Sequence, residues 1–180
     1  MTKLEVTVRE LVLGDIAELI EMDHSYHTDF VWQMDIQSND GEVNVRFREA
    51  RLPRSMRVEY PRDAAQLAED WKARDGVLVA EQEEHPVGYL SLSRSRISGL
   101  VTVTDLVVLR RLRRHGIGSS LLRAAQTWAS ERDSNQLMLE MQSKNYPAIC
   151  LANKLGYEFC GYSDRYYLNQ DIALFFARRF

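Results

Sequence analysis

The sequence has little of what builds disulfide-stapled, membrane-spanning or secreted proteins. Among its 180 residues only Cys150 and Cys160 are cysteines, too few for a disulfide framework and without metal-ligand spacing. We therefore expect both to be small buried side chains in a reducing compartment. No apolar run approaches the roughly 20 residues that cross a bilayer, and residues 1–5 contain no apolar segment typical of a signal peptide. These absences predict a cytoplasmic protein that does not contact membranes.

The sequence also has few prolines and glycines and a small net charge. Four prolines and nine glycines form no linker or low-complexity tract, so we expect one domain over residues 1–180. A formal net charge of −3 argues against a general nucleic-acid binder. The positive charge is nevertheless clustered, with six arginines between residues 46 and 62 and four between residues 110 and 114.

The spacing of apolar residues predicts an α+β chain. The expected strands are residues 6–10, 77–81, 87–93, 100–109, 137–141, 157–161, 166–168 and 172–176. The expected helices are residues 16–23, 63–71, 117–129 and 146–155. Three strands follow one another after residue 76 with turn-forming residues between them, which indicates an antiparallel meander. Residues 24–62 have a weaker pattern, with short extended pieces near 43–47 and 56–60.

The most informative segment joins a strand to the helix that begins near residue 117, and it reads Arg113-Arg114-His115-Gly116-Ile117-Gly118. The first backbone amides of a helix have no partners within the helix, and the helix dipole adds positive charge there. Two glycines let the backbone approach an anion closely or adopt positive φ. Together with the basic side chains, these features predict a diphosphate site.

Two other phosphate-binding motifs fit this turn less well. A Walker loop needs Gly-Lys-Ser/Thr, whereas Gly118 is followed by Ser119 and Ser120. A dinucleotide fingerprint needs a small residue three positions after Gly118, where this chain has Leu121. A glycine-rich turn that only starts a helix stays an open alternative.

The chain resembles the GNAT-type acetyltransferases through this turn and the segments around it. The matching pieces are Thr104–Val108, Arg113-x-x-Gly116-x-Gly118, Leu121-Leu122, Leu139-Glu140, Asn145, Ala148-Ile149 and Lys154–Tyr157. The segments Leu139–Gln142, Tyr167-x-Asn169 and Ile172–Phe176 are similar to streptothricin acetyltransferases. The resemblance covers roughly residues 77–180, while residues 1–75 carry no comparable motif.

The resemblance implies a mixed, mostly antiparallel central sheet with a splayed strand pair, flanked by helices. Residues 1–75 would form the acceptor side and residues 76–180 the part that binds acetyl-CoA, with no metal. The pantetheine would pair with the backbone of Leu106, Val107 and Val108 like an added strand. The pyrophosphate site would comprise Arg113, Arg114, His115, Gly116, Ile117, Gly118 and Ser119. Asn145 would contact the pantetheine or an ordered water, with a helix N-cap before Pro147 as the alternative.

The implied reaction is direct attack of a neutral amine on the thioester, which needs a base and an acid. Asp105 and Glu140 are the candidate bases, and each is equally compatible with a substrate anchor or a structural acid. The family's usual proton-donating tyrosine lies seven residues after the asparagine, where this chain has Ala152. Tyr166 is therefore a candidate acid, alongside Tyr167 and Tyr146.

The acceptor would be bound by residues 1–75. Asp29 and Trp32 offer a carboxylate and an aromatic face to a cationic amine. His24 and His27 are expected at the surface, with substrate binding or proton transfer as the alternative. A small-molecule amine or antibiotic is the favoured acceptor, with a protein N-terminus or lysine as the alternative. A non-catalytic acyl-CoA sensor, a nucleotide-binding regulatory module and a homodimer also stay open.

Overall fold

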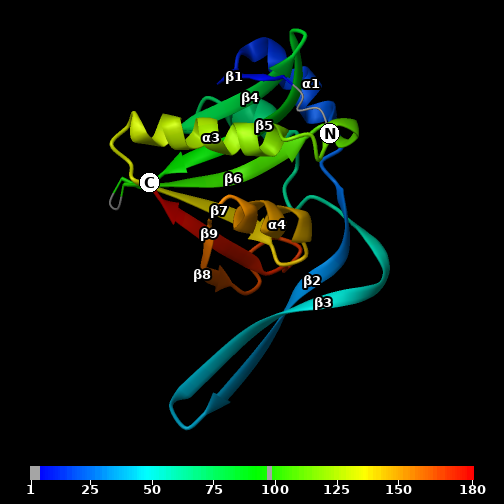
Figure 1. Ribbon diagram of the computed structural model, residues 1–180, viewed down its shortest axis with the longest axis vertical. Helices are drawn as coiled ribbons and strands as arrows, with labels where there is room; N and C mark the ends of the chain where they lie inside the picture. Colours follow the sequence, from blue (N-terminus) through cyan, green and yellow to red (C-terminus); the bar gives the residue numbers. More distant parts are fainter. Residues whose placement is uncertain (1–4, 97–98) are drawn as a thin grey trace.

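The strands predicted after residue 76 form the centre of a large mixed sheet in the computed structural model (Figure 1). Over the described residues, 5–96 and 99–180, this sheet has seven strands in the order β1-β4-β5-β6-β7-β9-β8. They are β1 (Thr7–Glu10), β4 (Gly76–Gln82), β5 (His85–Arg94), β6 (Leu100–Val108), β7 (Gln136–Gln142), β8 (Glu158–Ser163) and β9 (Ala173–Arg179). The helices are α1 (Ile16–Glu21), α2 (Gln66–Asp70), α3 (Ile117–Ser130) and α4 (Tyr146–Lys154), with short 3-10 turns at Leu13–Asp15 and Arg110–Leu112. None of the helices in the described part is long and apolar enough to cross a membrane.

Strands β4, β5 and β6 are the antiparallel meander that the sequence predicted. The β5–β6 register shifts by one residue, since Ser91 lies opposite Asp105 while Leu92 lies opposite Val103. Thr104 is therefore the extra residue of a bulge, which bends its strand and increases the local twist. The bulge lies directly after Val103, the last residue of β6 that pairs with β7.

The two halves of the sheet meet where β6 and β7 run in parallel. Their pairing extends from Leu100 opposite Gln136 to Val103 opposite Leu139 and then ends. Past this point both strands continue, β6 to Val108 and β7 to Gln142, without pairing to each other in the described chain. The strands therefore diverge, as the resemblance to a splayed pair predicted.

Alternating residues of the central strands pack into two cores on opposite faces of the sheet. Leu78 and Leu90 belong to the larger core, which α3 and α4 cover with Leu121, Leu122 and Ile149 among others. Val79, Tyr89 and Val107 belong to the smaller core, which α1 and α2 cover with Leu19 and Leu67. This alternation is the period of two that a strand imposes on its side chains.

The region between the first two helices is a long two-stranded hairpin outside the main sheet (Figure 1). It consists of β2 (Tyr26–Asn39) and β3 (Glu42–Val58), joined at Asp40 and Gly41, whose φ values are 35° and 88°. An Asp-Gly pair with two positive φ angles suits a tight hairpin because its twist matches that of the strands. The extended pieces expected near residues 43–47 and 56–60 lie in β3, except for the last two residues of the second piece, but the expectation that they are short and separate was wrong because both belong to one 17-residue strand.

Two smaller expectations were also wrong. Tyr166–Leu168 is not a strand but part of a turn, in which Tyr166 N donates to Asp171 O at 3.1 Å and Gln170 N to Tyr167 O at 2.7 Å. Cys160 is exposed rather than buried, because it lies on the edge strand β8, and Cys150 is half-buried.

Candidate active site

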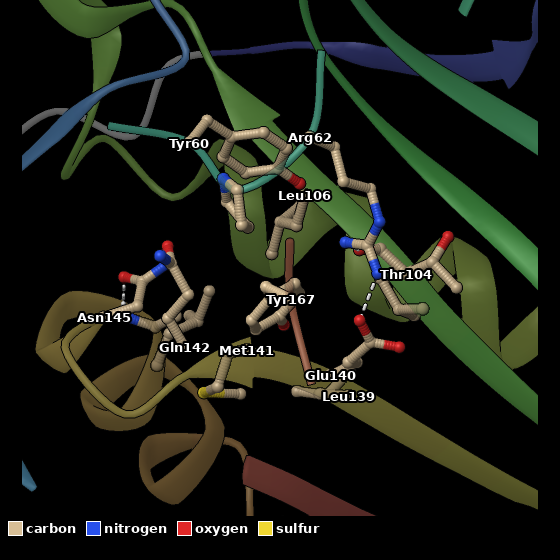
Figure 2. A pocket seen from close by; sticks show the side chains of 14 residues that line it. Tyr60, Arg62, Thr104, Leu106, Leu139, Glu140, Met141, Gln142, Asn145 and Tyr167 are labelled. Carbon is tan, nitrogen blue, oxygen red and sulfur yellow. Dashed lines mark hydrogen bonds and ion pairs between the residues drawn. The ribbon is translucent and has the colours of Figure 1, made fainter. Parts of the chain in front are cut away.

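A pocket lies where β6 and β7 diverge, and Figure 2 shows the side chains around it. Its walls come from both strands, from the start of α4, from the segment before α2 and from the loop before β9. The lining residues are Tyr60, Pro61, Arg62, Val103, Thr104, Leu106, Leu139, Glu140, Met141, Gln142, Asn145, Ala148, Leu151 and Tyr167.

One wall of the pocket is the unpaired edge of β6. Leu106, Val107 and Val108 pair with β5, opposite Leu90, Tyr89 and Gly88, while the other edge of β6 faces the gap. An open strand edge presents backbone N–H and C=O groups that can pair with an extended chain. The geometry is that of a sheet with room for one more strand.

The start of α3 carries the second feature that the sequence predicted. Gly116 precedes the helix with a φ of 91°, which favours glycine, and Arg114 is also left-handed at 71°. The hydrogen-bond ladder of the helix begins with Ser120 N donating to Gly116 O at 3.0 Å. The amides of Ile117, Gly118 and Ser119 precede this bond, so they are the first-turn donors available to an anion.

The Arg113 side chain fixes this turn through hydrogen bonds to backbone carbonyls. Its guanidinium and Nε donate to three backbone carbonyls, those of Val108 at 2.8 Å, Ser25 at 2.7 Å and Asp23 at 2.7 Å. This side chain therefore ties the loop to residues 23–25 rather than pointing to the anion site at the helix start. His115 accompanies it, with Nδ1 at 3.0 Å from the Arg113 carbonyl, whereas Arg114 is exposed.

Asn145 lies at the start of α4 and lines the pocket. Its Oδ1 accepts a hydrogen bond from Ala148 N at 3.2 Å, and Pro147 occupies the first turn, so Asn145 is the N-cap. The N-cap alternative is confirmed, and it places the same side chain at the pocket wall.

Arg62 connects the two diverging strands. It donates through Nη2 to the Glu140 carboxylate on β7 and through Nη1 to the Thr104 carbonyl on β6 at 2.8 Å. The Asp105 carboxylate lies 3.7 Å from the same Nη1 atom. Figure 2 shows this side chain reaching from its own segment across to Glu140.

Asp105 is held by donors on both of its oxygens. Tyr60 donates to Oδ1 at 2.7 Å and Arg74 Nη1 donates to Oδ2 at 2.8 Å, and the carboxylate is 5% exposed. Burial and the nearby Asp105 charge raise the pKa of Tyr60 well above its ordinary value. Tyr60 therefore keeps its proton, which is donated to Asp105.

Glu140 faces the pocket with a side chain that is 3% exposed. Besides Arg62 it accepts a hydrogen bond from the exposed Tyr166 hydroxyl, at 3.0 Å on Oε2. Tyr167 is buried and lines the pocket, with the Arg62 Cζ atom 5.3 Å from its ring centroid. Burial, followed by the charge of Glu140, raises the pKa of Tyr167, so its phenol is protonated at neutral pH.

Comparison with protein families identifies this arrangement. The acetyltransferase (GNAT) family model matches residues 45–157, which is more than half of the chain. The chain belongs to the acetyltransferase (GNAT) family. Both the resemblance and the α+β GNAT-like fold predicted from the sequence are thus confirmed, and the chain is an N-acetyltransferase.

Relatives of this GNAT enzyme include proteins with named acceptors. The chain is 29% identical over 159 residues to a streptothricin acetyltransferase of Streptomyces lavendulae, covering 86% of this chain and 82% of the relative. It is 32% identical over 77 residues to an N-alpha-acetyltransferase of Saccharolobus solfataricus, covering 42% of this chain and 46% of the relative.

Solved structures extend the likeness to the whole GNAT fold. A nourseothricin acetyltransferase superposes with a TM-score of 0.81 at 24% identity, covering 97% of this chain and 98% of the other. A candidate streptothricin acetyltransferase of Bacillus anthracis, solved in complex with acetyl coenzyme A, gives a TM-score of 0.75 at 19% identity. That comparison covers 98% of this chain and all of the other.

The structure brings together the three candidate catalytic residues of this GNAT chain. Asp105, Glu140 and Tyr166 belong to one connected set of contacts centred on Arg62. Sequence reasoning missed Arg62, Tyr60 and Arg74 as members of this set. The crowding of arginines before residue 62 was the only signal for Arg62, and it did not separate this residue from its exposed neighbours.

Asp29 and Trp32 lie apart from this pocket. Asp29 is exposed on β2, and the Trp32 indole packs against Phe47, Phe159 and Phe176 at ring-centroid distances of 6.4, 5.9 and 5.6 Å. These two residues do not line the pocket described above.

His24 was expected at the surface, but it is half-buried, with Nδ1 2.7 Å from Met22 O and Nε2 3.0 Å from the Tyr89 hydroxyl. The expectation was wrong because Tyr89 is brought in from β5, 65 residues away in the sequence, which a local pattern does not reveal. His27 is exposed as expected.

Proposed function

We propose that this GNAT enzyme transfers the acetyl group of acetyl-CoA to a primary amine of a small molecule, with streptothricin-type antibiotics as the first acceptors to test. The observation that carries this proposal is the extent of the similarity to a streptothricin acetyltransferase, which spans 86% of the chain. A likeness of this extent goes beyond residues 76–180 into the acceptor half. Tyr60, Pro61 and Arg62, which form one pocket wall, come from that half.

The described residues fit acetyl-CoA. The open edge of β6 from Thr104 to Val108 would pair with the pantetheine arm, and the Ile117, Gly118 and Ser119 amides with Arg114 would hold the pyrophosphate. Asn145 would complete the pantetheine site with its amide nitrogen. When bound, acetyl-CoA supplies an activated acetyl thioester.

Tyr167 is the side chain best suited to protonate the leaving thiolate. Its raised pKa keeps the phenol protonated, and in Figure 2 its ring lies between Leu106 of β6 and Met141 of β7. Tyr60 also lines the pocket, but its hydroxyl donates at 2.7 Å to the buried Asp105 carboxylate, whereas Tyr167 interacts with Glu140, the candidate base in the pocket. Tyr166 is exposed and bound to Glu140, so it would orient that carboxylate rather than donate to sulfur.

Glu140 is the better base of the two carboxylates, because it lines the pocket and Asp105 does not. Acting directly or through a water, it would take the proton that the attacking amine must lose. Asp105, with a donor on each oxygen, would hold Tyr60 and Arg74 in place.

A protein N-terminus or lysine is the competing acceptor. The supporting similarity to an N-alpha-acetyltransferase covers 46% of that protein, so it reports on part of the fold and less on the acceptor. The pocket is bounded by side chains from two loops, Tyr60–Arg62 and Tyr167, which favours a slender amine over a folded protein surface.

A thiol-release assay across amines tests the proposal. The panel comprises streptothricin, nourseothricin, aminoglycosides, polyamines and short peptides with free N-termini, with mass spectrometry of the products. We expect acetylated antibiotic or polyamine at the highest kcat/KM. Preferred acetylation of peptides would reject the small-molecule acceptor, and binding of acetyl-CoA without thiol release from any amine would favour a sensor.

A further inference from the structure

The loop that carries Tyr167 joins β8 to β9 and spans residues 164–172. It consists of turns and bends rather than a strand or a helix, and two of its residues, Arg165 and Gln170, have φ values of 51° and 63°. Left-handed backbone is unfavourable at residues other than glycine and persists only where surrounding contacts hold it. The position of Tyr167 in the pocket therefore depends on the contacts that this loop makes.

Asp171 is the centre of those contacts. Its backbone carbonyl accepts hydrogen bonds from Tyr166 N at 3.1 Å and from Tyr167 N at 3.4 Å. Its carboxylate accepts from Asn169 Nδ2 at 3.0 Å, while its own N–H donates to Asn169 Oδ1 at 3.1 Å. One residue therefore bonds to the backbone of both tyrosines and closes the turn that follows them.

The Asp171 carboxylate is also fixed to the end of β7. Gln142 Nε2 donates to Asp171 Oδ2 at 2.7 Å, and Lys144 Nζ forms an ion pair with Oδ1. The Asp171 side chain is 11% exposed. Because hydrogen bonds to an ionised group are stronger than bonds between neutral groups, these contacts tie the loop firmly to the strand that carries Glu140.

Gln142 is in turn fixed by Tyr26 at the start of β2. The Tyr26 hydroxyl donates to Gln142 Oε1 at 2.8 Å, and both side chains are buried. Burial, followed by the charge of Asp171, raises the pKa of Tyr26, so its phenol keeps the proton that it donates. Since the Gln142 amide oxygen accepts from Tyr26, its amide nitrogen faces Asp171. The amide therefore has one orientation, which defines where Asp171 lies relative to the pocket wall.

Asp171 is not placed to act on a substrate itself. It is not among the residues that line the pocket, and its two oxygens already accept from the side chains of Gln142, Lys144 and Asn169. Tyr167 does line the pocket and interacts there with Arg62 and Glu140. The network around Asp171 therefore reaches the reaction through Tyr167.

We propose that Asp171 is a positioning residue that, together with Gln142, holds Tyr167 where its phenol protonates the leaving thiolate. This inference rests on the proposed function, in which Tyr167 is the acid. A displacement of about 1 Å lowers the rate of an enzyme by about 10²-fold. A tyrosine on a loop without regular structure therefore needs a fixed anchor, and Asp171 supplies it by joining the Tyr167 backbone to β7.

A double-mutant cycle between Asp171→Ala and Tyr167→Phe tests the proposal. Asp171→Ala is expected to lower kcat by about 10-fold or more, with little change in KM for acetyl-CoA. In a Tyr167→Phe background the same substitution should cost less than about 2-fold, because no phenol remains to be positioned. Thiol release is measured with streptothricin as acceptor, and also without an amine as hydrolysis of acetyl-CoA, which needs the same leaving-group proton.

The matched control is Asp164→Ala in the same loop. Asp164 is exposed and its ion pair with Arg165 is 3.9 Å long, so we expect the wild-type kcat. Asn169→Ala is a milder variant that keeps the carboxylate and removes two of the bonds of Asp171. It replaces Asp171→Ala in the cycle if circular dichroism and thermal unfolding show that Asp171→Ala does not fold. A smaller loss of kcat is expected for it, again confined to enzyme with the Tyr167 phenol.

The outcomes separate this inference from the proposed function. A loss of the same size in both backgrounds would overturn the positioning role and leave Tyr167 as the acid. A folded Asp171→Ala variant with the wild-type kcat would overturn it as well. If Tyr167→Phe itself keeps the wild-type kcat, the acid assignment of the proposed function fails, and the positioning role fails with it.

Discussion

Arg62 and Glu140 form an ion pair across the point where β6 and β7 separate. Since Arg62 also donates to the Thr104 carbonyl at 2.8 Å, a single guanidinium spans both diverging strands. Where the backbone pairing of β6 and β7 ends, the two strands are therefore connected by a side chain from the segment before α2. We call this Arg62 bridge the strut. The ring of Tyr167, which lines the pocket, packs against its guanidinium.

Removing the strut is expected to destabilise the fold. Arg62→Met leaves Glu140, with its 3% exposed side chain, without its ion-pair partner. Breaking a buried pair costs about 3–5 kcal/mol, and we expect the lower end because Arg62 is 26% exposed. Urea unfolding measures the loss, and the double variant Arg62→Met/Glu140→Gln should recover part of it. A single variant as stable as the wild type would contradict the strut.

Tyr167→Phe is expected to lower kcat by about 10²-fold or more, the range for loss of a general acid. KM for acetyl-CoA should change little, because the phenyl ring keeps the packing. The matched control is Tyr166→Phe, which we expect to stay within a few-fold of the wild type in steady-state assays. If Tyr166→Phe suffers the larger loss, the acid role belongs to Tyr166.

Acetyl-CoA is expected to raise the melting temperature of the wild type. At 100 times Kd the stabilisation is about 2.7 kcal/mol, or roughly 5–10 °C for a chain of this size. Gly118→Asp should remove most of this gain by placing a carboxylate among the first-turn amides of α3. Gly118→Ala is the neutral control, since its Cβ meets only the flexible Leu151 Cδ2 at 3.2 Å. Equal gains for the wild type and Gly118→Asp would refute the pyrophosphate assignment.

His24 makes the fold sensitive to acid. Burial lowers its pKa and outweighs the attraction of Asp105 and Asp23, so below about pH 6.5 the unfolded chain binds more protons at this position. The neutral form of His24 therefore costs the folded state no stability above about pH 6.5. Stability is lost as the pH falls from there through the lower pKa that His24 has in the folded chain. His24→Gln should flatten the dependence of the unfolding free energy between pH 7.5 and 5.5, and His85→Gln, at an exposed residue, should not. An unchanged slope in His24→Gln would exclude this source.

The local features of the site could be predicted because each is encoded by neighbouring residues. The start of α3 needs Gly116 at positive φ and unpaired amides, and both follow from six consecutive residues. The Asn145 cap and the meander before it are similarly local. Their assignment to acetyl-CoA required the family resemblance in addition.

The pocket's charged network could not be predicted, because its members come from separate parts of the chain. Tyr60 and Asp105 are 45 residues apart, and Arg62 and Glu140 are 78 residues apart. No spacing rule relates residues at such separations. The β2–β3 hairpin was predicted only as two short extended pieces, because the apolar side of its strands is interrupted by Ser38 and the two strands form a sheet of their own.

The unpaired edge of β6 has a further consequence for solubility. A strand edge that faces open solvent is a template on which other copies of the chain aggregate, and proteins generally shield such edges. Here Thr104 and Leu106 of the free stretch line the pocket, together with Glu140, Gln142 and Asn145. Since β7 and the start of α4 contribute the side chains on the other side of this pocket, we expect the gap that creates the site also to shield the edge from association with another sheet.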